Sequence, residues 1–161
     1  MAIIVLESHE SFHREFRGEV LQPSTAHLLD ELGLLEYILA QPHSLLTEGR
    51  VRINGKTAGE FSFQTIVPEY PYAIWMPQPI FLQALVDKAA PFSSSQCWMG
   101  ARVNGLIEDA GTVVGVRGVR HGKEAFEIRA DVVVGADGRF STMRRLGDFD
   151  TAYQHCDFDV I

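Results

Sequence analysis

The sequence lacks the features that mark several classes of protein. It has only two cysteines, Cys97 and Cys156, in 161 residues, and they form neither a CxxC pair nor a metal-ligand spacing. They would form a disulfide only if the fold brought them together, and reduced thiols in a cytoplasmic protein are the simpler interpretation. Apolar runs are strand-sized, and none approaches the length of a membrane-spanning helix. We therefore expect neither a disulfide scaffold nor a membrane protein.

Basic residues are also scarce, with 14 Lys and Arg against 21 Asp and Glu and a net charge of −7. Proteins that bind nucleic acid carry clustered basic residues, so we expect no nucleic-acid partner. The six histidines show no ligand spacing, so no metal site is expected. The 46% of hydrophobic residues is typical of a globular protein with one domain, or one domain and a small attachment.

The first half of the chain begins with an apolar run. Residues 3–6 end at Glu7, the pattern of a strand buried on both faces of a parallel sheet. Pro23 predicts the start of a helix that ends at Gly33, with Leu28, Leu29 and Leu32 as its apolar stripe. Residues 34–40 predict further helical turns, and Asn54-Gly55 within residues 51–63 predicts a hairpin.

The second half alternates one helix with several strands. A helix is expected after Pro77, and three successive strands at residues 98–108, 112–120 and 124–129. Residues 131–134 predict a second buried strand, and residues 141–146 the start of a helix. The fold class is therefore α/β, with an antiparallel β-meander inserted between parallel strands.

The turn between residue 134 and Arg139 carries the first chemical signal. A buried strand that ends in Gly-Ala-Asp-Gly places small residues where a ligand must approach closely. Asp137 would accept hydrogen bonds from hydroxyls, and the following helix would offer free N–H groups to phosphate oxygens. The alternative is a strand-to-helix turn in which glycines supply positive φ and Asp137 makes an Asx-turn. The four residues alone leave both interpretations open.

Glu7 and Arg17 are two further candidates. An acidic residue just after a buried strand holds the adenosine ribose in dinucleotide folds, although carboxylates at strand ends also serve solubility. Arginine suits pyrophosphate because its planar fork donates two parallel hydrogen bonds, although arginines such as Arg14 and Arg17 are common in polar loops. Neither residue is specific when it is considered singly.

In combination, these segments resemble the FAD-dependent aromatic hydroxylases, the flavoenzymes related to p-hydroxybenzoate hydroxylase and phenol monooxygenase. The resemblance runs in order over residues 3–147. It is carried by Val-Leu-Glu ending at Glu7, Phe-Arg-Gly-Glu around Arg17, Leu-Leu-Asp-Glu-Leu-Gly-Leu-Leu at 28–35, Met-Pro-Gln ending at Gln78, and Val-Val-Val-Gly-Ala-Asp-Gly-Arg at 132–139.

The resemblance implies a role for each matched position. Glu7 would bind the ribose of the FAD adenosine, and Arg17 would lie against the pyrophosphate and the ribityl-flavin end. Gln78 would hydrogen-bond the ribityl chain. Asp137 and Gly138 would lie near the FAD phosphates, where the motif is also linked to the NAD(P)H step. A catalytic side chain remains unknown, because the flavin carries the chemistry in this family.

The resemblance also sets the expected domain organisation. Residues 1–147 would form an incomplete FAD-binding Rossmann-like domain with a flanking meander at 98–129, and residues 148–161 the start of a substrate-domain sheet. The family's opening Gly-x-Gly-x-x-Gly has no counterpart, since the first glycine is Gly18. We therefore expect a truncated chain with a partial FAD site that does not hydroxylate alone.

The function implied is that of an NAD(P)H-dependent aromatic-ring monooxygenase in the cytoplasm, acting at full length on a small aromatic or polycyclic substrate. One alternative is a non-enzymatic remnant or a self-associating domain, such as a homodimer that covers the place of the missing strand. Another is a domain that binds a different nucleotide, or NAD(P)H alone, on the same scaffold.

Overall fold

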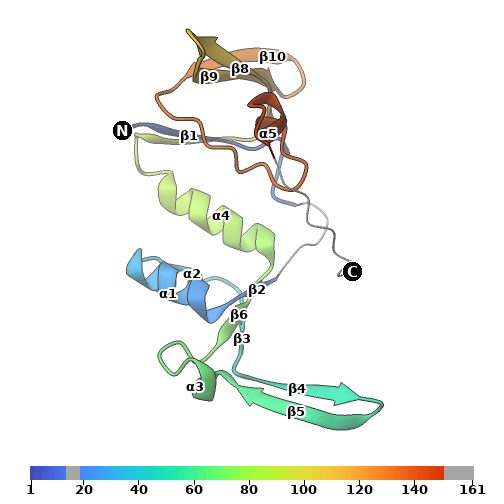
Figure 1. Cartoon of the computed structure of the whole chain (residues 1–161). Coiled ribbons are helices and arrows are strands. Elements are labelled where there is room, and N and C mark those ends of the chain that lie inside the picture. The colour runs from blue at the N-terminus through green and yellow to red at the C-terminus, as the bar shows by residue number, and fades with distance from the viewer. Residues whose placement is uncertain (14–18, 151–161) are drawn as a thin grey trace. The chain divides into compact units, whose positions relative to one another are not determined.

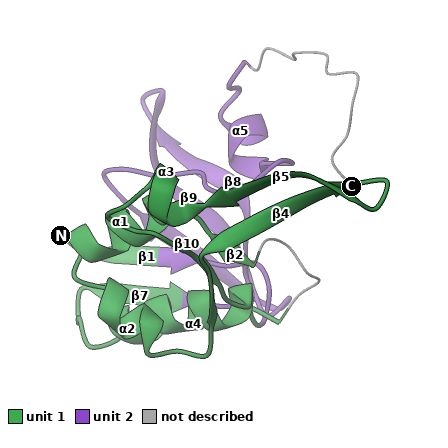
Figure 2. Cartoon of the chain, turned by 90° about the horizontal axis from the view of Figure 1, so that it is seen from below, with its two compact units in different colours: residues 1–4, 11–97 green, residues 5–10, 98–161 purple. Residues whose placement is uncertain are grey.

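A computed structural model describes residues 1–13 and 19–150 of the chain (Figure 1). The chain divides into two compact units, one of residues 1–4 and 11–97, the other of residues 5–10 and 98–161 (Figure 2). Helices and mostly antiparallel strands alternate along it. The α/β class predicted from the sequence is thereby confirmed.

In its described residues, the first unit combines four helices with a small antiparallel sheet. In the sheet, β6 (Ala73–Trp75) lies between β2 (Val20–Leu21) and β3 (Ser44–Leu46). The helices are α1 (Pro23–Glu31), α2 (Leu35–Leu39), α3 (Phe63–Ile66) and α4 (Gln78–Ala89). The sequence predicted α1, α2 and α4 but missed this sheet, whose strands are two or three residues long.

The ends of α1 follow from two residues. Pro23 occupies the first helical turn, where a missing N–H costs nothing. At the other end Gly33 has φ +65°, and the Leu34 N–H donates to the Leu29 carbonyl oxygen at 2.7 Å, which completes a Schellman motif. Of the predicted leucine stripe only Leu29 is buried, whereas Leu28 and Leu32 are exposed.

The core of the first unit lies where α1, α2, α4 and β6 meet. Its fully buried side chains include Ile38 of α2, Ile74 of β6 and Met76 just before α4. Tyr70 closes one side, because its hydroxyl donates to an Asp30 carboxylate oxygen at 2.8 Å and its ring stacks on His27. The Asp30 hydrogen bond, followed by burial, raises the pKa of Tyr70 to about 12.

A hairpin of β4 (Glu48–Ile53) and β5 (Lys56–Ser62) completes this unit. Asn54 and Gly55 both have positive φ, the conformation that a two-residue turn of type I′ needs. The predicted hairpin is therefore confirmed. Most of its side chains are exposed, including Val51 and Ile53, and among the described residues neither outer edge pairs with another strand.

The first strand, β1 (Ile3–Leu6), pairs with β7 (Ser95–Trp98). The Ile3 N–H donates to the Ser94 carbonyl oxygen at 2.7 Å, and the Glu7 N–H to that of Trp98 at 3.0 Å, so both strands run in the same direction. The strand was predicted correctly, but its burial on both faces was not. Ile3 and Val5 are about half exposed, because within the described part of the chain β1 pairs with β7 alone.

The second unit contains the predicted meander. β9 (Thr112–Arg120) lies between β8 (Ala101–Asp109) and β10 (Glu124–Arg129) in an antiparallel sheet. The first of these strands begins at Ala101 instead of residue 98, because Gly100 turns the chain with φ +68°. A five-residue helix, α5 (Thr142–Leu146), follows as expected.

The buried strand predicted at residues 131–134 is absent. The segment forms no ladder with any described strand, and the side chains of Val132 and Val134 are 76% and 82% exposed. An apolar run becomes a buried strand only when a neighbouring strand and a covering layer are available. The described residues supply neither, so the prediction was wrong.

Candidate functional site

The Gly-Ala-Asp-Gly turn places Asp137 at the start of α5. One carboxylate oxygen of Asp137 accepts the Ser141 hydroxyl, and the other accepts the N–H groups of Thr142 at 2.6 Å and Met143 at 3.0 Å. The Ser141 hydroxyl oxygen accepts the Arg144 N–H at 2.9 Å. Together the two side chains satisfy the N–H groups that the first turn of a helix leaves unpaired.

These hydrogen bonds also affect the pKa of the Asp137 carboxyl group. Burial acts to raise its pKa, but the hydrogen bonds from the Ser141 hydroxyl and from the Met143 and Thr142 N–H groups outweigh burial and lower the pKa below its ordinary value. The carboxylate is therefore firmly ionised at neutral pH. It is a strong acceptor for any donor that competes with the helix.

One prediction about this turn was wrong. The N–H groups of α5 were expected to be free for phosphate oxygens, but Thr142, Met143 and Arg144 already donate to Asp137 and Ser141. The turn matches the alternative interpretation in this respect, since Gly138 supplies positive φ of +81° and Asp137 bonds the backbone that follows it. A ligand at this turn would have to exchange places with these donors.

Glu7 lies directly after β1 and is only half-buried. Its Oε1 atom is 2.6 Å from His9 Nδ1, 2.9 Å from the His9 backbone nitrogen and 3.4 Å from Ser8 Oγ. The main chain of Glu7 is fixed as well, because its carbonyl oxygen accepts the Ala101 N–H at 2.8 Å. Glu7 was a candidate from the sequence, and the structure adds its contact with His9, two residues further along the chain.

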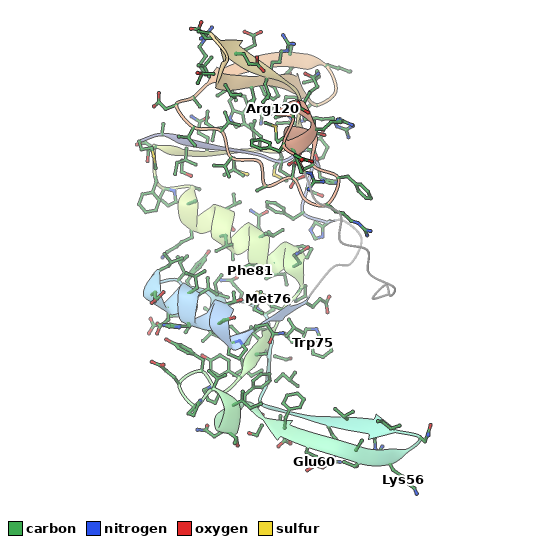
Figure 3. All side chains as sticks on the ribbon, viewed as in Figure 1. Lys56, Glu60, Trp75, Met76, Phe81 and Arg120 are labelled. Atoms are coloured by element: carbon green, nitrogen blue, oxygen red, sulfur yellow. The ribbon has the colours of Figure 1, made fainter. Side chains whose placement is uncertain are left out.

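Gln78 is the first residue of α4 and is half-buried. The chain before it is held by Glu19, whose carbonyl oxygen accepts the Met76 N–H at 2.7 Å and whose carboxylate accepts the Trp75 indole N–H at 2.7 Å. Figure 3 labels Trp75 at the end of β6, Met76 between β6 and α4, and Phe81 on α4. The start of α4, where Gln78 lies, is thus held by two contacts with Glu19.

The predicted site residues fall into three groups. Glu7, Asp137 and Gly138 belong to the second unit, and Gln78 belongs to the first. Arg17 lies outside the described residues. In the part of the chain that is described, no group of three or more His, Cys, Asp or Glu side chains could hold a metal ion, and no helix is long and apolar enough to cross a membrane.

A surface depression lies on the described residues of each unit. That of the first unit is mainly apolar, has a volume of about 360 Å³ and is lined by Leu34, Leu85, Ala89 and Phe92 among others. That of the second unit, about 440 Å³, lies on the meander beside Arg117 and Phe126. Neither of these two depressions is lined by Glu7, Gln78 or Asp137.

Comparison with known proteins gives a consistent result. A family model described as an FAD binding domain matches residues 1–160. Over 144 residues the chain is 35% identical to 6-methylpretetramide 4-monooxygenase from Streptomyces rimosus, a match that covers 89% of this chain and 34% of that protein. The chain thus spans about a third of the length of this relative.

Solved structures agree on the fold. The anhydrotetracycline hydroxylase OxyS from Streptomyces rimosus matches with a TM-score of 0.76 and 25% identity, over 96% of this chain and 30% of that one. The p-nitrophenol 4-monooxygenase PnpA from Pseudomonas putida matches with a TM-score of 0.79 and 22% identity, over 90% of this chain and 37% of that one. The second likeness concerns the fold alone.

Proposed function

Since this chain belongs to the family of FAD-binding domains, we propose that it contributes the adenosine-binding and phosphate-binding part of an FAD site. The observation that carries the proposal is the place of Glu7, a carboxylate at the carboxyl end of β1 that is oriented by His9. Ligands of open α/β sheets bind outside the carboxyl ends of the strands, and an acidic residue there accepts the ribose hydroxyls. The Glu7 carboxylate, an acceptor at this place, fits the ribose hydroxyls of FAD.

Four further residues would complete this part of the site. We assign Arg17 to the pyrophosphate and the ribityl-flavin end, and Gln78 to the ribityl chain. Asp137 and Gly138 would lie near the phosphates. The ionised Asp137 carboxylate supports a contact with a donor such as a ribityl hydroxyl, and argues against a direct contact with phosphate oxygens, since like charges repel. The space beside Gly138 is open, since a Cβ atom at that position would meet nothing within 4 Å, and its positive φ is the reason that glycine suits the turn.

The reaction we propose is aromatic-ring hydroxylation with NAD(P)H as co-substrate, in the cytoplasm. A bound flavin would supply the redox chemistry, and this chain would bind and orient it. The names of two relatives, 6-methylpretetramide 4-monooxygenase and anhydrotetracycline hydroxylase, support a small aromatic or polycyclic substrate. Because the chain spans about a third of such a relative, we propose that these 161 residues do not hydroxylate alone.

A second candidate is a self-associating, non-enzymatic domain. It is favoured by the exposure of Val132 and Val134 and by that of Ile3 and Val5 on β1, which pairs on one edge only among the described residues, because open strand edges with exposed apolar side chains add readily to another chain. In this case the protein would elute as a dimer and take up no flavin.

Titration of the purified chain with FAD, followed by flavin fluorescence, tests the proposal. We expect saturable binding that Glu7→Gln weakens roughly tenfold, since the neutral amide loses a charge-assisted hydrogen bond. The matched control is Glu36→Gln, an exposed residue of α2, which should leave the affinity unchanged. A chain that takes up no FAD, or a Glu7 variant that binds as the wild type does, would overturn the proposal. Gel filtration in the same experiment identifies a dimer.

A further inference from the structure

The loop after β1 contains a contact that the family resemblance does not assign. The His9 ring nitrogen Nδ1 lies 2.6 Å from Glu7 Oε1, and the His9 backbone nitrogen lies 2.9 Å from the same oxygen. Because an ionised carboxylate only accepts hydrogen bonds, Nδ1 must carry the proton in this contact. A single residue thus donates twice to one oxygen of Glu7.

The backbone around this pair is fixed independently of the two side chains. The His9 carbonyl oxygen accepts the Gly100 N–H at 2.8 Å, and the Glu7 carbonyl oxygen accepts the Ala101 N–H at 2.8 Å. Further along the loop, Glu10 Oε2 lies 2.8 Å from His121 Nδ1. The loop is therefore attached at several points to the start of β8 and to the turn between β9 and β10.

The surroundings of Gly100 show that the loop after β1 packs closely against the residue before β8. A Cβ atom at that position would lie 2.6 Å from Glu10 Oε1 and 2.7 Å from His121 Nδ1, and φ is +68°. The positive φ favours glycine at this position, and a Cβ atom would also displace the ends of the Glu10 and His121 side chains. Because the loop backbone is held this tightly, the imidazole of His9 reaches Glu7 from a fixed position.

We propose that His9 is a positioning residue that fixes the Glu7 side chain for the ribose hydroxyls of an adenine nucleotide. A glutamate side chain loses rotamer freedom when it binds a ligand, and that loss weakens binding. His9 imposes part of this loss before the ligand arrives, so that Glu7 is preorganised. The inference rests on the proposed function, because it assumes that Glu7 meets a ribose.

The test compares two nucleotides that differ only at the ribose. The wild-type chain is titrated with ADP and with 2′,3′-dideoxy-ADP by calorimetry, and the ratio of the two dissociation constants measures how much the hydroxyls contribute. We expect a ratio of roughly 10, as for the loss of a hydrogen bond to a charged group, and a fall to about 2 in His9→Ala. His9→Asn should retain the wild-type ratio, because its amide nitrogen takes nearly the place of Nδ1.

Two controls separate positioning from a general loss of structure. His13→Ala removes an exposed histidine of the same segment and should leave the ratio unchanged. In a Glu7→Gln background, His9→Ala should have no further effect on the ratio, since the two residues act as a unit. A change that merely loosened the fold would weaken the binding of both nucleotides equally. The ratio of their dissociation constants would then stay at its wild-type value.

The possible failures are distinguishable. If the wild type prefers ADP and His9→Ala retains that preference, the inference is wrong while the proposed function stands. If Glu7→Gln removes the preference but His9→Asn behaves as His9→Ala does, hydrogen-bond donation by His9 is not the cause and the inference is again wrong. If the wild-type chain binds neither nucleotide, the proposed function itself fails, and the inference fails with it.

Discussion

Asp137 serves its own helix and is also a candidate ligand residue. Its carboxylate accepts the Ser141 hydroxyl and the N–H groups of Thr142 and Met143, so a bound hydroxyl would compete with these donors. The competition is possible because α5 is only five residues long and a short helix depends on its capping residues. Binding at this turn and the order of α5 are therefore coupled.

We predict that Asp137→Ala loosens α5 by about 1 kcal/mol, the usual effect of losing a capping side chain. Hydrogen exchange at the Thr142 and Met143 amides should accelerate about fivefold. Asp131→Ala, at an exposed neighbouring position, is the control and should leave both amides unchanged. Equal exchange in the Asp137 variant and the wild type would show that the carboxylate does not hold the helix.

The same contact gives a pH dependence. The pKa of Asp137 is lowered in the folded chain, so its contribution to stability is complete above the pKa of the unfolded state and is lost as pH falls through the lowered folded value. Exchange at Thr142 and Met143, corrected for intrinsic rates, should therefore increase in acid. The increase should be absent in Asp137→Ala.

Residues of the site were predictable to different degrees. Glu7 and Asp137 could be named as candidates from their places after apolar runs, because that signal is local, and their roles as ligand residues stay predictions. The role of Asp137 as a cap was left open, since the same four residues fit a ligand turn and a helix start. His9 was missed because a histidine two residues after a glutamate has no meaning until the backbone between them is known to bend.

Among the elements, β9 imposes the tightest steric requirement. Gly118 lies opposite Phe126 of β10 and Val103 of β8. A Cβ atom at Gly118 would collide with the Arg102 carbonyl oxygen and would lie 2.6 Å from Phe126 Cζ. The phenyl ring thus covers the glycine and takes the space of a side chain. On the same face, the Phe126 ring meets Trp98 edge to face, and Arg120 lies over the Trp98 ring (Figure 3).

We predict that Gly118→Ala destabilises the meander by about 1 to 3 kcal/mol, because overpacking forces backbone shifts. Gly59→Ala in β5 is the matched control, since a Cβ atom there meets nothing within 4 Å and should be neutral or slightly stabilising. Urea denaturation monitored by tryptophan fluorescence compares the two variants. Equal urea midpoints in the Gly118→Ala and Gly59→Ala variants would contradict the close packing between β8, β9 and β10.

The elements that the sequence predicted well have local causes. The β4–β5 hairpin follows from Asn54-Gly55, and the end of α1 from Gly33, each within a few residues of chain. The strand predicted at 131–134 failed because pairing depends on a partner distant in sequence. The central strand β6 was missed because three residues, Ala73–Trp75, carry no measurable period. Periodicity predicts long elements, whereas short ones depend on tertiary contacts.

On the scale of the whole molecule, the buried apolar side chains are unevenly distributed. The core cluster, which includes Ile38, Ile74 and Met76, belongs entirely to the first unit. In the described part of the second unit the buried hydrophobic residues are Ala101 and Val116. Since apolar burial provides most of the stability of a fold, we expect the first unit to be the more stable.

We predict that Ile74→Ala destabilises the first unit by about 2 to 4 kcal/mol, as for other large-to-small changes at fully buried positions. Hydrogen exchange should rise in α1, α2 and β6. The amides of β9 should keep their wild-type exchange rates, because none of the residues of the core cluster lies in the second unit. A uniform acceleration over both units would show that they unfold as one cooperative body.

The exposed β4–β5 hairpin has a consequence for the colloidal behaviour of the protein. Its outer edges carry backbone donors and acceptors beside Val51, Ile53 and Phe61, which are all at least 40% exposed, and such edges are templates for aggregation. Charged side chains oppose this: Arg50 and Glu60 form an ion pair at 2.6 Å, and Lys56 and Glu60 lie on β5 (Figure 3). We expect these charges to act as gatekeepers that limit aggregation through the hairpin edges.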